Sequence, residues 1–350
     1  MSGELTAEKI YPDDEERWNR LLLHSLYPSF RQSISYEYSK QSGGREVATY
    51  IFMKDDCDVA GVHYSVKQYG PGLFIVADIL SGFVFKNEPD VILLEYLVTH
   101  FIDFSRSKGA DYIRIYTWLP RIIAGDQTKY EALFNNILFP KGFKAIGEGR
   151  HTYWINLSKS EDELLRNMKR QTRYDVKKGL KSSIINSKYL SPENDIINEF
   201  WILYKTIAEN KGFNMYSEEK FKRETISLMN AGMAVLFVET YNEDKINFSL
   251  ASNFGIASYL HGAVDLRFKK YRDCPSPGHL AQWKMITEMK SRGARIYDMG
   301  FCPGPVPVTD HPAYDIWRFK YGFGGDHVEF LPMYENKRKP LKVKIYELIK

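Results

Sequence analysis

The sequence predicts an α/β protein with two similar domains in tandem. The chain has 350 residues, which is more than a single hydrophobic core usually fills. Short apolar runs rich in β-branched and aromatic residues, typical of strands, alternate with longer segments of helical period. One joint between a helix and a strand also occurs twice, because residues 107–114 read SKGADYIR and residues 291–298 read SRGARIYD. Chance similarity of two helix ends is the alternative. Since the neighbouring elements also follow the same order, we predict one domain at 1–149 and a second at 150–334.

The second joint lies in residues 276–325, the stretch around which the rest of the chain is arranged. A helix is predicted over Pro277–Arg292, because apolar residues recur every three positions and proline is tolerated in a first turn. Gly293 supplies the left-handed position that ends a helix, and Arg295–Met299 has the character of a buried strand. The loop 301–314 contains four prolines. Because loops at strand ends often carry chemistry, we expect functional residues beside it.

The other elements follow from the same patterns. In the first domain we predict a helix at 14–26 and a meander of three antiparallel strands at 47–53, 59–67 and 73–79. A long helix at 89–108, a strand at 113–118, a shorter helix at 128–138 and a last strand after 142 are predicted to follow. In the second domain we predict a strand at 152–157, two helices at 195–210 and 217–230, and three further strands at 234–239, 246–254 and 257–264. This order is typical of an acetyltransferase-like domain.

Composition narrows the class of protein. Hydrophobic and charged contents are ordinary for a soluble enzyme, and a net charge of +4 does not by itself indicate a nucleic-acid partner. The cysteines Cys57, Cys274 and Cys302 are far apart and odd in number, which argues against disulfides and a zinc site. The acidic N-terminus is unlike a signal peptide, and no apolar run approaches the ~20 residues of a membrane helix. We expect a cytoplasmic protein without a metal.

A basic stripe marks a helix that is predicted to begin at Ser158 or Ser160 and to continue through Lys181. At about 100° per residue, its apolar residues gather on one side and a cationic stripe lies about 120° away. Asp175 is the only carboxylate between Leu164 and Lys181. Such a stripe is often a solvated face, but the lack of acidic partners favours contacts with phosphates. The stripe consists of Arg166, Arg170, Arg173, Lys177 and Lys181.

Several motifs in the second domain occur together in a particular order: Tyr153–Ser158 (YWINLS), Arg170–Lys178, Ile207–Gly212 (IAENKG), Tyr297–Gly300 (YDMG) and Phe319–Gly325 (FKYGFGG). Each is weak alone, but their order and spacing resemble the Fem family, the FemX-like peptidyltransferases that depend on aminoacyl-tRNA. The likeness covers most of the second domain. Residues 32–40 and 109–114 add fainter similarity in the first.

This resemblance implies a fold and a reaction. The fold is two acetyltransferase-like (GNAT-like) domains in tandem, with the helix at 335–350 packing back on the first domain. No coiled-coil arm is expected, since the helices between Ser191 and Ala231 are too short for one. Family members form an amide by letting an acceptor amine attack the ester between an amino acid and its tRNA. The implied partners are aminoacyl-tRNA, as co-substrate, and an amine-bearing peptide-like acceptor from a cell-wall precursor or a specialised metabolite. A monomer without a cofactor is expected.

Three residues are candidates for the chemistry that the resemblance implies. Lys320 is the candidate cation beside the ester carbonyl or the terminal phosphate, although a surface lysine before a Gly-rich turn is the alternative. Phe319 fits a core aromatic or one beside the terminal adenine. Asp298, at a strand end, could hold the attacking ammonium or orient Lys320, or it could cap a loop. The tRNA-binding candidates are Arg166, Arg170, Arg173 and Lys177.

The acceptor is less well specified. Relatives that act on nucleotide-linked pentapeptides use a lysine near the position of Lys40 and an arginine in a loop that here reads FNMYS (213–217) and lacks one. Residues 259–262 read YLHG, with a histidine where a tyrosine is frequent, and 113–118 lacks an Asp-Pro ending. These departures leave the acceptor open. The substrate-binding candidates are Lys40, Tyr216, Tyr259 and His261.

Two other functions are alternatives. An acyl-CoA-dependent N-acyltransferase should carry Gln/Arg-x-x-Gly-x-Gly/Ala before a helix, whereas the nearest matches begin at Lys67 and Lys144 and lead into strands. A non-catalytic RNA-binding or envelope-assembly protein would keep the basic helix without turnover. Cys302, next to Pro303, gives no indication of a nucleophile beyond its presence in a loop.

Overall fold

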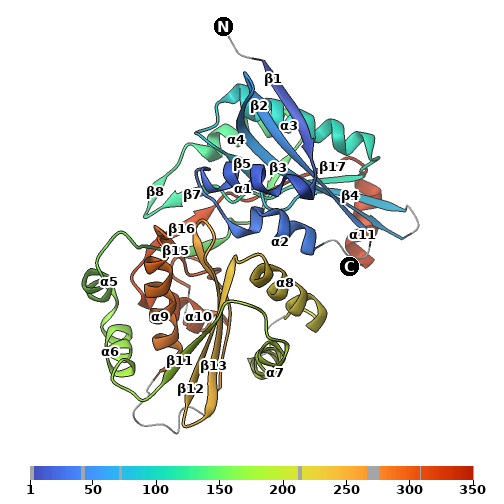
Figure 1. The fold of residues 1–350 in the computed structure, drawn as a ribbon. Helices are drawn as coiled ribbons and strands as arrows, with labels where there is room; N and C mark the ends of the chain where they lie inside the picture. The colour runs from blue at the N-terminus through green and yellow to red at the C-terminus, as the bar shows by residue number, and fades with distance from the viewer. Residues whose placement is uncertain are drawn as a thin grey trace. The chain divides into compact units, whose positions relative to one another are not determined.

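The computed structural model describes residues 4–40, 44–70, 73–211, 215–265, 276–307 and 309–349 (Figure 1). The chain divides into two compact units. Unit 1 comprises Met1–Arg150 and Val328–Lys350, and unit 2 comprises His151–His327. The segment that returns to unit 1 therefore includes a strand as well as the C-terminal helix. Cys274 and the loop residues Phe213 and Asn214 lie outside the described residues.

Unit 1 contains a mixed sheet in the order β1-β2-β3-β4-β6-β17-β9, with β5 also on β3. Neighbouring strands run antiparallel except β4 and β6, which are parallel. The predicted meander of three strands is therefore confirmed as β2, β3 and β4. The strand bounds are β1 Leu5–Ile10, β2 Arg45–Lys54, β3 Cys57–Tyr69, β4 Phe74–Ile79, β5 Phe83–Phe85, β6 Tyr112–Ile115, β9 Lys144–Ile146 and β17 Met333–Lys337.

Helices cover this sheet because each presents an apolar face to it. The core includes Leu94, Leu97 and Phe101 of α3, together with Phe134 of α4 and side chains of β3 and β4. A smaller cluster joins Val343 of α11 to Phe74, Val76 and Tyr112 of the sheet. The α-helices are α1 Glu15–Leu23, α2 Ile34–Ser39, α3 Val91–Ser107, α4 Tyr130–Leu138 and α11 Pro340–Ile349. The short strands β7 Pro120–Ile123, β8 Asp126–Gln127 and β16 Asp326–Phe330 pair with one another, β16 with β7 and β7 with β8.

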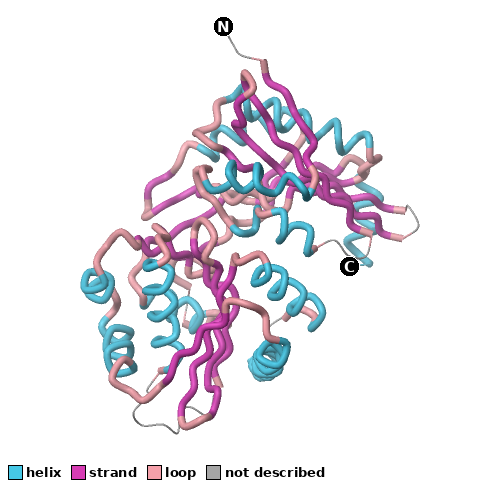
Figure 2. The backbone as a smooth tube through the Cα atoms, viewed as in Figure 1, coloured by secondary structure: helices cyan, strands magenta, loops and turns pink. Residues whose placement is uncertain are grey.

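Unit 2 has a sheet of similar design, in the order β11-β12-β13-β14-β15-β10. Only the pair β14 and β15 is parallel among these strands. Helices α7 and α8 pack on one side of this sheet and α9 on the other, as Figure 2 shows. The bounds are β10 His151–Asn156, α5 Glu161–Asn167, α6 Arg170–Gly179, β11 Ile185–Tyr189, α7 Asn194–Lys211, α8 Glu218–Asn230, β12 Ala234–Tyr241, β13 Asp244–Ser252, β14 Ala257–Val264, α9 Pro277–Ser291, β15 Ile296–Asp298 and α10 Tyr314–Gly322.

The repeated joint has the same structure in both units. Gly109, after α3, and Gly293, after α9, have φ values of 68° and 87°. Each glycine is followed by an alanine whose amide bonds back into the helix, over 3.0 Å in unit 1 and 3.1 Å in unit 2. The next strand, β6 or β15, then runs parallel to the last strand of the meander. The two strands occupy equivalent places, as a duplication requires.

The single helix predicted through Lys181 is wrong. Met168 and Lys169 are extended, with ψ of 147° and 149°, and they separate α5 from α6. The amide of Lys169 donates to the carbonyl of Gly322 over 2.8 Å, and the Met168 side chain is buried in the core. The Lys169 amide thus bonds to a distant residue and not to a carbonyl of its own helix. Local sequence patterns do not reveal such a tertiary contact.

The expected absence of an arm concerns the stretch between Ser191 and Ala231. Its described part holds α7, with 18 residues, and α8, with 13, and shows no coiled-coil arm. None of the helices in the described ranges combines the length and apolar character needed to cross a bilayer.

Candidate active site

The parallel pairing of β14 with β15 ends at the carboxyl end of β15. They pair at Ala257 with Tyr297 and at Ser258 with Asp298. After Asp298 the chain turns at Gly300, which has a φ of 73°. A Cβ at this position would lie 2.9 Å from the carbonyl oxygen of Tyr259 and 3.3 Å from Nζ of Lys320. Because glycine has no Cβ, the turn after β15 can approach both the Tyr259 backbone and the Lys320 ammonium closely.

Lys320 brings a buried positive charge to this point. Its residue is 7% exposed, so it is not the surface lysine that the sequence left as an alternative. Nζ donates to the carbonyl oxygen of Phe301 over 2.6 Å and lies 5.7 Å from the ring centroid of Tyr259. The Phe301 carbonyl therefore holds the ammonium of Lys320 next to the end of β15.

Asp298 organises the turn that follows β15. Its Oδ1 accepts the amide hydrogen of Gly300 over 2.7 Å and the hydroxyl hydrogen of Thr152. The same hydroxyl oxygen lies 2.9 Å from the carbonyl oxygen of Gly300. This is the geometry of a loop cap, and it fixes the backbone that presents the Phe301 carbonyl to Lys320. Thr152, from β10, is a member of the site that the sequence did not indicate.

Phe319 precedes Lys320 in α10 but contacts different neighbours. Its ring stacks on His279 of α9, with centroids 5.1 Å apart and planes 28° apart. Nδ1 of His279 lies 3.2 Å from Oδ2 of Asp175 and 2.5 Å from Oγ of Ser276. Burial lowers the pKa of His279, while Asp175 opposes this effect. Asp175, the one carboxylate of the basic segment, is thus turned inward toward α9, which no local pattern could show.

Two acceptor candidates of unit 2, Tyr216 and His261, lie in an aromatic cluster. The rings of Tyr216 and His261 are 5.5 Å apart and perpendicular. Tyr204 and Phe221 lie 5.6 Å and 5.2 Å from the same histidine, and neither was predicted. Tyr259 is two residues earlier on β14, near Lys320, and burial raises its pKa above the ordinary range. The sequence signal for Tyr204 and Phe221 was limited to the apolar character of their helices.

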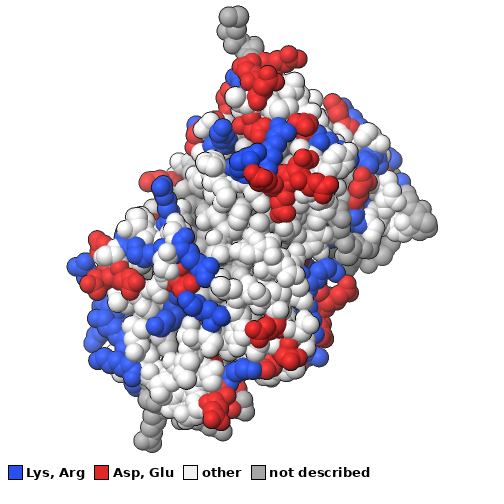
Figure 3. All heavy atoms as spheres, in the orientation of Figure 1, with Lys and Arg blue, Asp and Glu red and all other residues white. Residues whose placement is uncertain are grey.

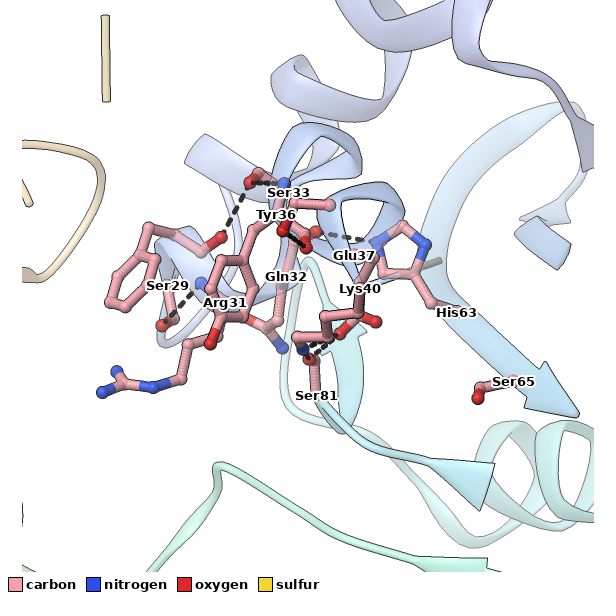
Figure 4. A network of polar contacts seen from close by, with 12 residues as sticks. Ser29, Arg31, Gln32, Ser33, Tyr36, Glu37, Lys40, His63, Ser65 and Ser81 are labelled. Atoms are coloured by element: carbon pink, nitrogen blue, oxygen red, sulfur yellow. Dashed lines mark hydrogen bonds and ion pairs between the residues drawn. The ribbon is translucent and has the colours of Figure 1, made fainter. Parts of the chain in front are cut away.

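Lys40 belongs to a polar network in unit 1 (Figure 4). Its Nζ donates to Oε1 of Glu37 over 2.9 Å, lies 3.5 Å from Oγ of Ser81 and lies 4.1 Å from the ring centroid of Tyr36. Glu37 is 1% exposed. Burial alone would raise the pKa of this carboxyl, but Lys40, His63 and the hydrogen bonds hold it below its usual value. The lysine is therefore held by a buried carboxylate.

The basic residues divide between the two short helices. Arg166 is exposed on α5, and Arg170 and Lys177 are exposed on α6. Arg173 is half-buried, and its Nη1 donates to the carbonyl of Arg166 over 2.9 Å, so it caps the end of α5. Figure 3 shows Lys and Arg side chains gathered over α5 and α6, with acidic side chains at the start of α5. Arg170, Arg173 and Lys177 still follow one another on α6. Arg166 belongs to the separate helix α5, so it does not continue their stripe.

Comparison with known proteins extends this picture. Neither a family model nor a curated protein sequence matches the chain. Among solved structures, FemX is 18% identical, covers 98% of this chain and 99% of its own, and superposes with a TM-score of 0.80. A tandem GNAT protein from the clavulanic acid biosynthesis pathway is 10% identical, with coverages of 96% and 99% and a TM-score of 0.56. L-PGS from Bacillus licheniformis is 12% identical, with both coverages at 98% and a TM-score of 0.56. The chain has the fold of FemX, two acetyltransferase-like domains in tandem, as its sequence predicts.

Proposed function

We propose that the protein is a Fem-like aminoacyltransferase, which moves an amino acid from aminoacyl-tRNA to the amine of a peptide-like acceptor. The observation that carries the proposal is the buried ammonium of Lys320 at the end of the pairing between β14 and β15. The likeness to FemX over nearly the whole chain supports the same function. Such an enzyme works in the cytoplasm, where aminoacyl-tRNA is made.

The proposed reaction forms a C–N bond and breaks the ester C–O bond. The acceptor amine attacks the ester carbonyl, whose oxygen becomes negatively charged in the tetrahedral intermediate. The Lys320 ammonium, held by the Phe301 carbonyl, stabilises that charge in a position set before the reaction starts. The amine then loses a proton, and the terminal hydroxyl of the tRNA leaves with one. Asp298 acts as a positioning residue, because it holds the turn that carries Phe301.

The partners are assigned to separate surfaces of the units. In unit 2, Arg166, Arg170 and Lys177 are exposed and suit tRNA phosphates, while Arg173 supports them by capping α5. Tyr216, Tyr259 and His261 are assigned to the acceptor. In unit 1, Lys40 is assigned to an anionic part of the acceptor, which must compete with Glu37 for the ammonium. We propose a monomeric enzyme without a resident cofactor.

Mass spectrometry of reaction products tests the proposal. Purified protein is incubated with cell extract and with tRNAs charged with isotope-labelled amino acids. We expect a labelled amide product that disappears when the tRNA is left uncharged and when Lys320→Met replaces the wild type. A product formed only after acyl-CoA is added would favour the second candidate, an N-acyltransferase, for which the tandem GNAT structure is the supporting observation. Tight tRNA binding without any product would favour the non-catalytic RNA-binding alternative.

A further inference from the structure

The C-terminal helix α11 has apolar side chains on both sides. Val343 is fully buried and packs in unit 1 with Phe74, Val76 and Tyr112. On the side away from Val343, Leu341, Ile345 and Leu348 are 78%, 58% and 87% exposed. Their spacing of four and then three residues places them along one face of the helix. A single exposed leucine is ordinary, but three large aliphatic side chains in a row on one face call for an explanation.

A fourth exposed apolar residue adjoins the helix. Leu73, just before β4, is 68% exposed. Nζ of Lys342 donates to the carbonyl oxygen of Leu73 over 3.1 Å, which keeps this residue beside α11. The backbone of this exposed residue therefore adjoins the helix that carries the apolar stripe of α11, meaning Leu341, Ile345 and Leu348.

Positive charge borders the stripe. At about 100° per residue, Lys344 lies at one edge of the exposed face and Lys342 at the other. The acidic residue of the helix, Glu347, pairs with Lys337 over 2.8 Å. Lys342 lies 3.6 Å from Oδ1 of the buried Asp111, so Lys344 is the edge lysine that the proposal uses. Residues 335–349 contain five lysines and arginines against two glutamates. An apolar face with lysines at its edges is the pattern of a helix that lies in the interface of an anionic bilayer.

Other occupants fit less well. Antiparallel pairing of α11 with a second copy would bring Lys342 and Lys344 against the same lysines of the partner, and like charges destabilise such a contact. A protein partner with a stable interface normally covers about 800 Å² on each side, with a packed centre, whereas this stripe is a convex row of aliphatic side chains.

We propose that α11 docks unit 1 on an anionic phospholipid surface. Leu341, Ile345 and Leu348 enter the boundary between headgroups and acyl chains, and Lys344 at the edge of the stripe contacts lipid phosphates. The helix lies on the membrane, because its ten residues are too few to span one. Docking of this kind is independent of the proposed transfer reaction and uses residues from another part of the chain.

Co-sedimentation with vesicles tests this proposal on the full chain. One set of vesicles is phosphatidylcholine alone, and the other is phosphatidylcholine mixed with phosphatidylglycerol. The main variant, Leu341→Ser/Ile345→Ser/Leu348→Ser, keeps every charge. The matched control is Ile202→Ser on α7, because Ile202 is 63% exposed and lies in unit 2. Since all these side chains are exposed, the variants should fold, and circular dichroism checks that they do.

We expect the wild type to bind the mixed vesicles and the triple variant to partition at least about tenfold less, with Ile202→Ser unchanged. Leu348→Ser alone should give a smaller loss, and Lys344→Gln should weaken binding to the mixed vesicles only. Wild-type protein that ignores the mixed vesicles, or a triple variant that binds as well as wild type, would overturn the proposal. So would a wild-type dimer in sedimentation velocity that the triple variant dissociates, since a second copy would then cover the stripe. Amide synthesis with a soluble acceptor should be equal in all these variants, which separates this test from that of the transfer reaction.

Discussion

The ammonium of Lys320 lies 2.6 Å from the carbonyl oxygen of Phe301, a residue 19 positions earlier in the chain. This contact ties α10 to the turn after β15 and holds a cation beside Gly300. A charge fixed in advance at a partly desolvated strand end can stabilise a developing oxyanion without reorganising during the reaction.

Replacement of Lys320 by methionine should leave the fold and acceptor binding nearly intact but lower the single-turnover rate by on the order of 10² to 10³. Because the help is confined to the transition state, kcat should fall more than the apparent KM rises. Lys320→Arg keeps the charge but changes its shape, so it should recover part of the rate. Rapid-quench measurement with preformed aminoacyl-tRNA separates chemistry from product release.

Lys290→Met is the matched control for that experiment. Nζ of Lys290 also donates to a backbone carbonyl, that of Leu157, over 2.7 Å, but it lies near the C-terminal end of α9. Its loss should leave the rate unchanged. A wild-type rate for Lys320→Met would show that the lysine is structural.

Substitution of Asp298 tests whether its oxygen or its charge matters. Asp298→Asn keeps an oxygen that can accept the Gly300 amide, so we expect stability and most of the rate to persist. Asp298→Ala leaves that buried amide unsatisfied and should cost about 1–3 kcal/mol of unfolding free energy, with a lower rate as Phe301 shifts. Thermal unfolding and single-turnover kinetics of both variants are compared. An inactive but stable Asp298→Asn would instead assign the negative charge to the acceptor ammonium.

The basic residues should appear in the salt dependence of tRNA binding. Replacing Arg166, Arg170, Arg173 and Lys177 by glutamine should weaken binding and reduce the slope of log K against log salt by roughly one for each phosphate that is no longer bound. Arg173→Gln alone should also lower the unfolding temperature, because it removes the cap of α5. Lys222→Gln/Arg223→Gln on α8 is the control, since both side chains are paired with glutamates. An unchanged slope in the quadruple variant would exclude these residues from the tRNA surface.

The aromatic cluster around His261 should affect the acceptor. His261→Phe keeps an aromatic ring against Tyr216 but removes both ring nitrogens. If the imidazole binds the acceptor, the KM for that substrate should rise several-fold while kcat and the KM for aminoacyl-tRNA change little. Tyr204→Phe, which keeps the neighbouring ring, is the control. Equal effects of the two variants on all parameters would mean that the cluster serves packing alone.

Glu239 makes the stability of unit 2 depend on pH. It is fully buried in β12, opposite Asn186 and Asn247 on the adjacent strands, and burial raises its pKa to about 8. In the unfolded chain the carboxyl titrates near 4.5. Between these two pH values the folded state holds a proton that the unfolded state has lost. The free energy of unfolding therefore falls as the pH rises, by at most about 1.4 kcal/mol per pH unit from this group.

Glu239→Gln should therefore match the wild type at pH values below the unfolded pKa and become more stable than it as the pH approaches 8. Unfolding temperatures at several pH values measure the difference. Glu288→Gln gives the opposite sign, because burial is outweighed at Glu288 by Lys188 and Arg292, which lower its pKa. A constant difference between Glu239→Gln and wild type across this range would contradict the assignment.

Local patterns in the sequence determined much of the fold. The period of α9 placed Leu280, Trp283, Ile286 and Met289 in the core, and all four are buried. Both helix–glycine–strand joints could be predicted because a left-handed residue after a helix is a local requirement. The order of these elements, together with the motifs, indicated the tandem fold that the FemX structure confirms.

The tertiary structure alone decided where the candidate residues point. The break between α5 and α6 depends on a hydrogen bond from the Lys169 amide to the carbonyl of Gly322, and the Phe301 carbonyl fixes the position of the Lys320 ammonium. Asp175 was part of a basic segment in the sequence, yet in the fold it faces His279. Such contacts join segments that are distant along the chain. Their geometry is set by how the helices pack on the sheet, whereas periodicity and propensity report only on neighbours in sequence.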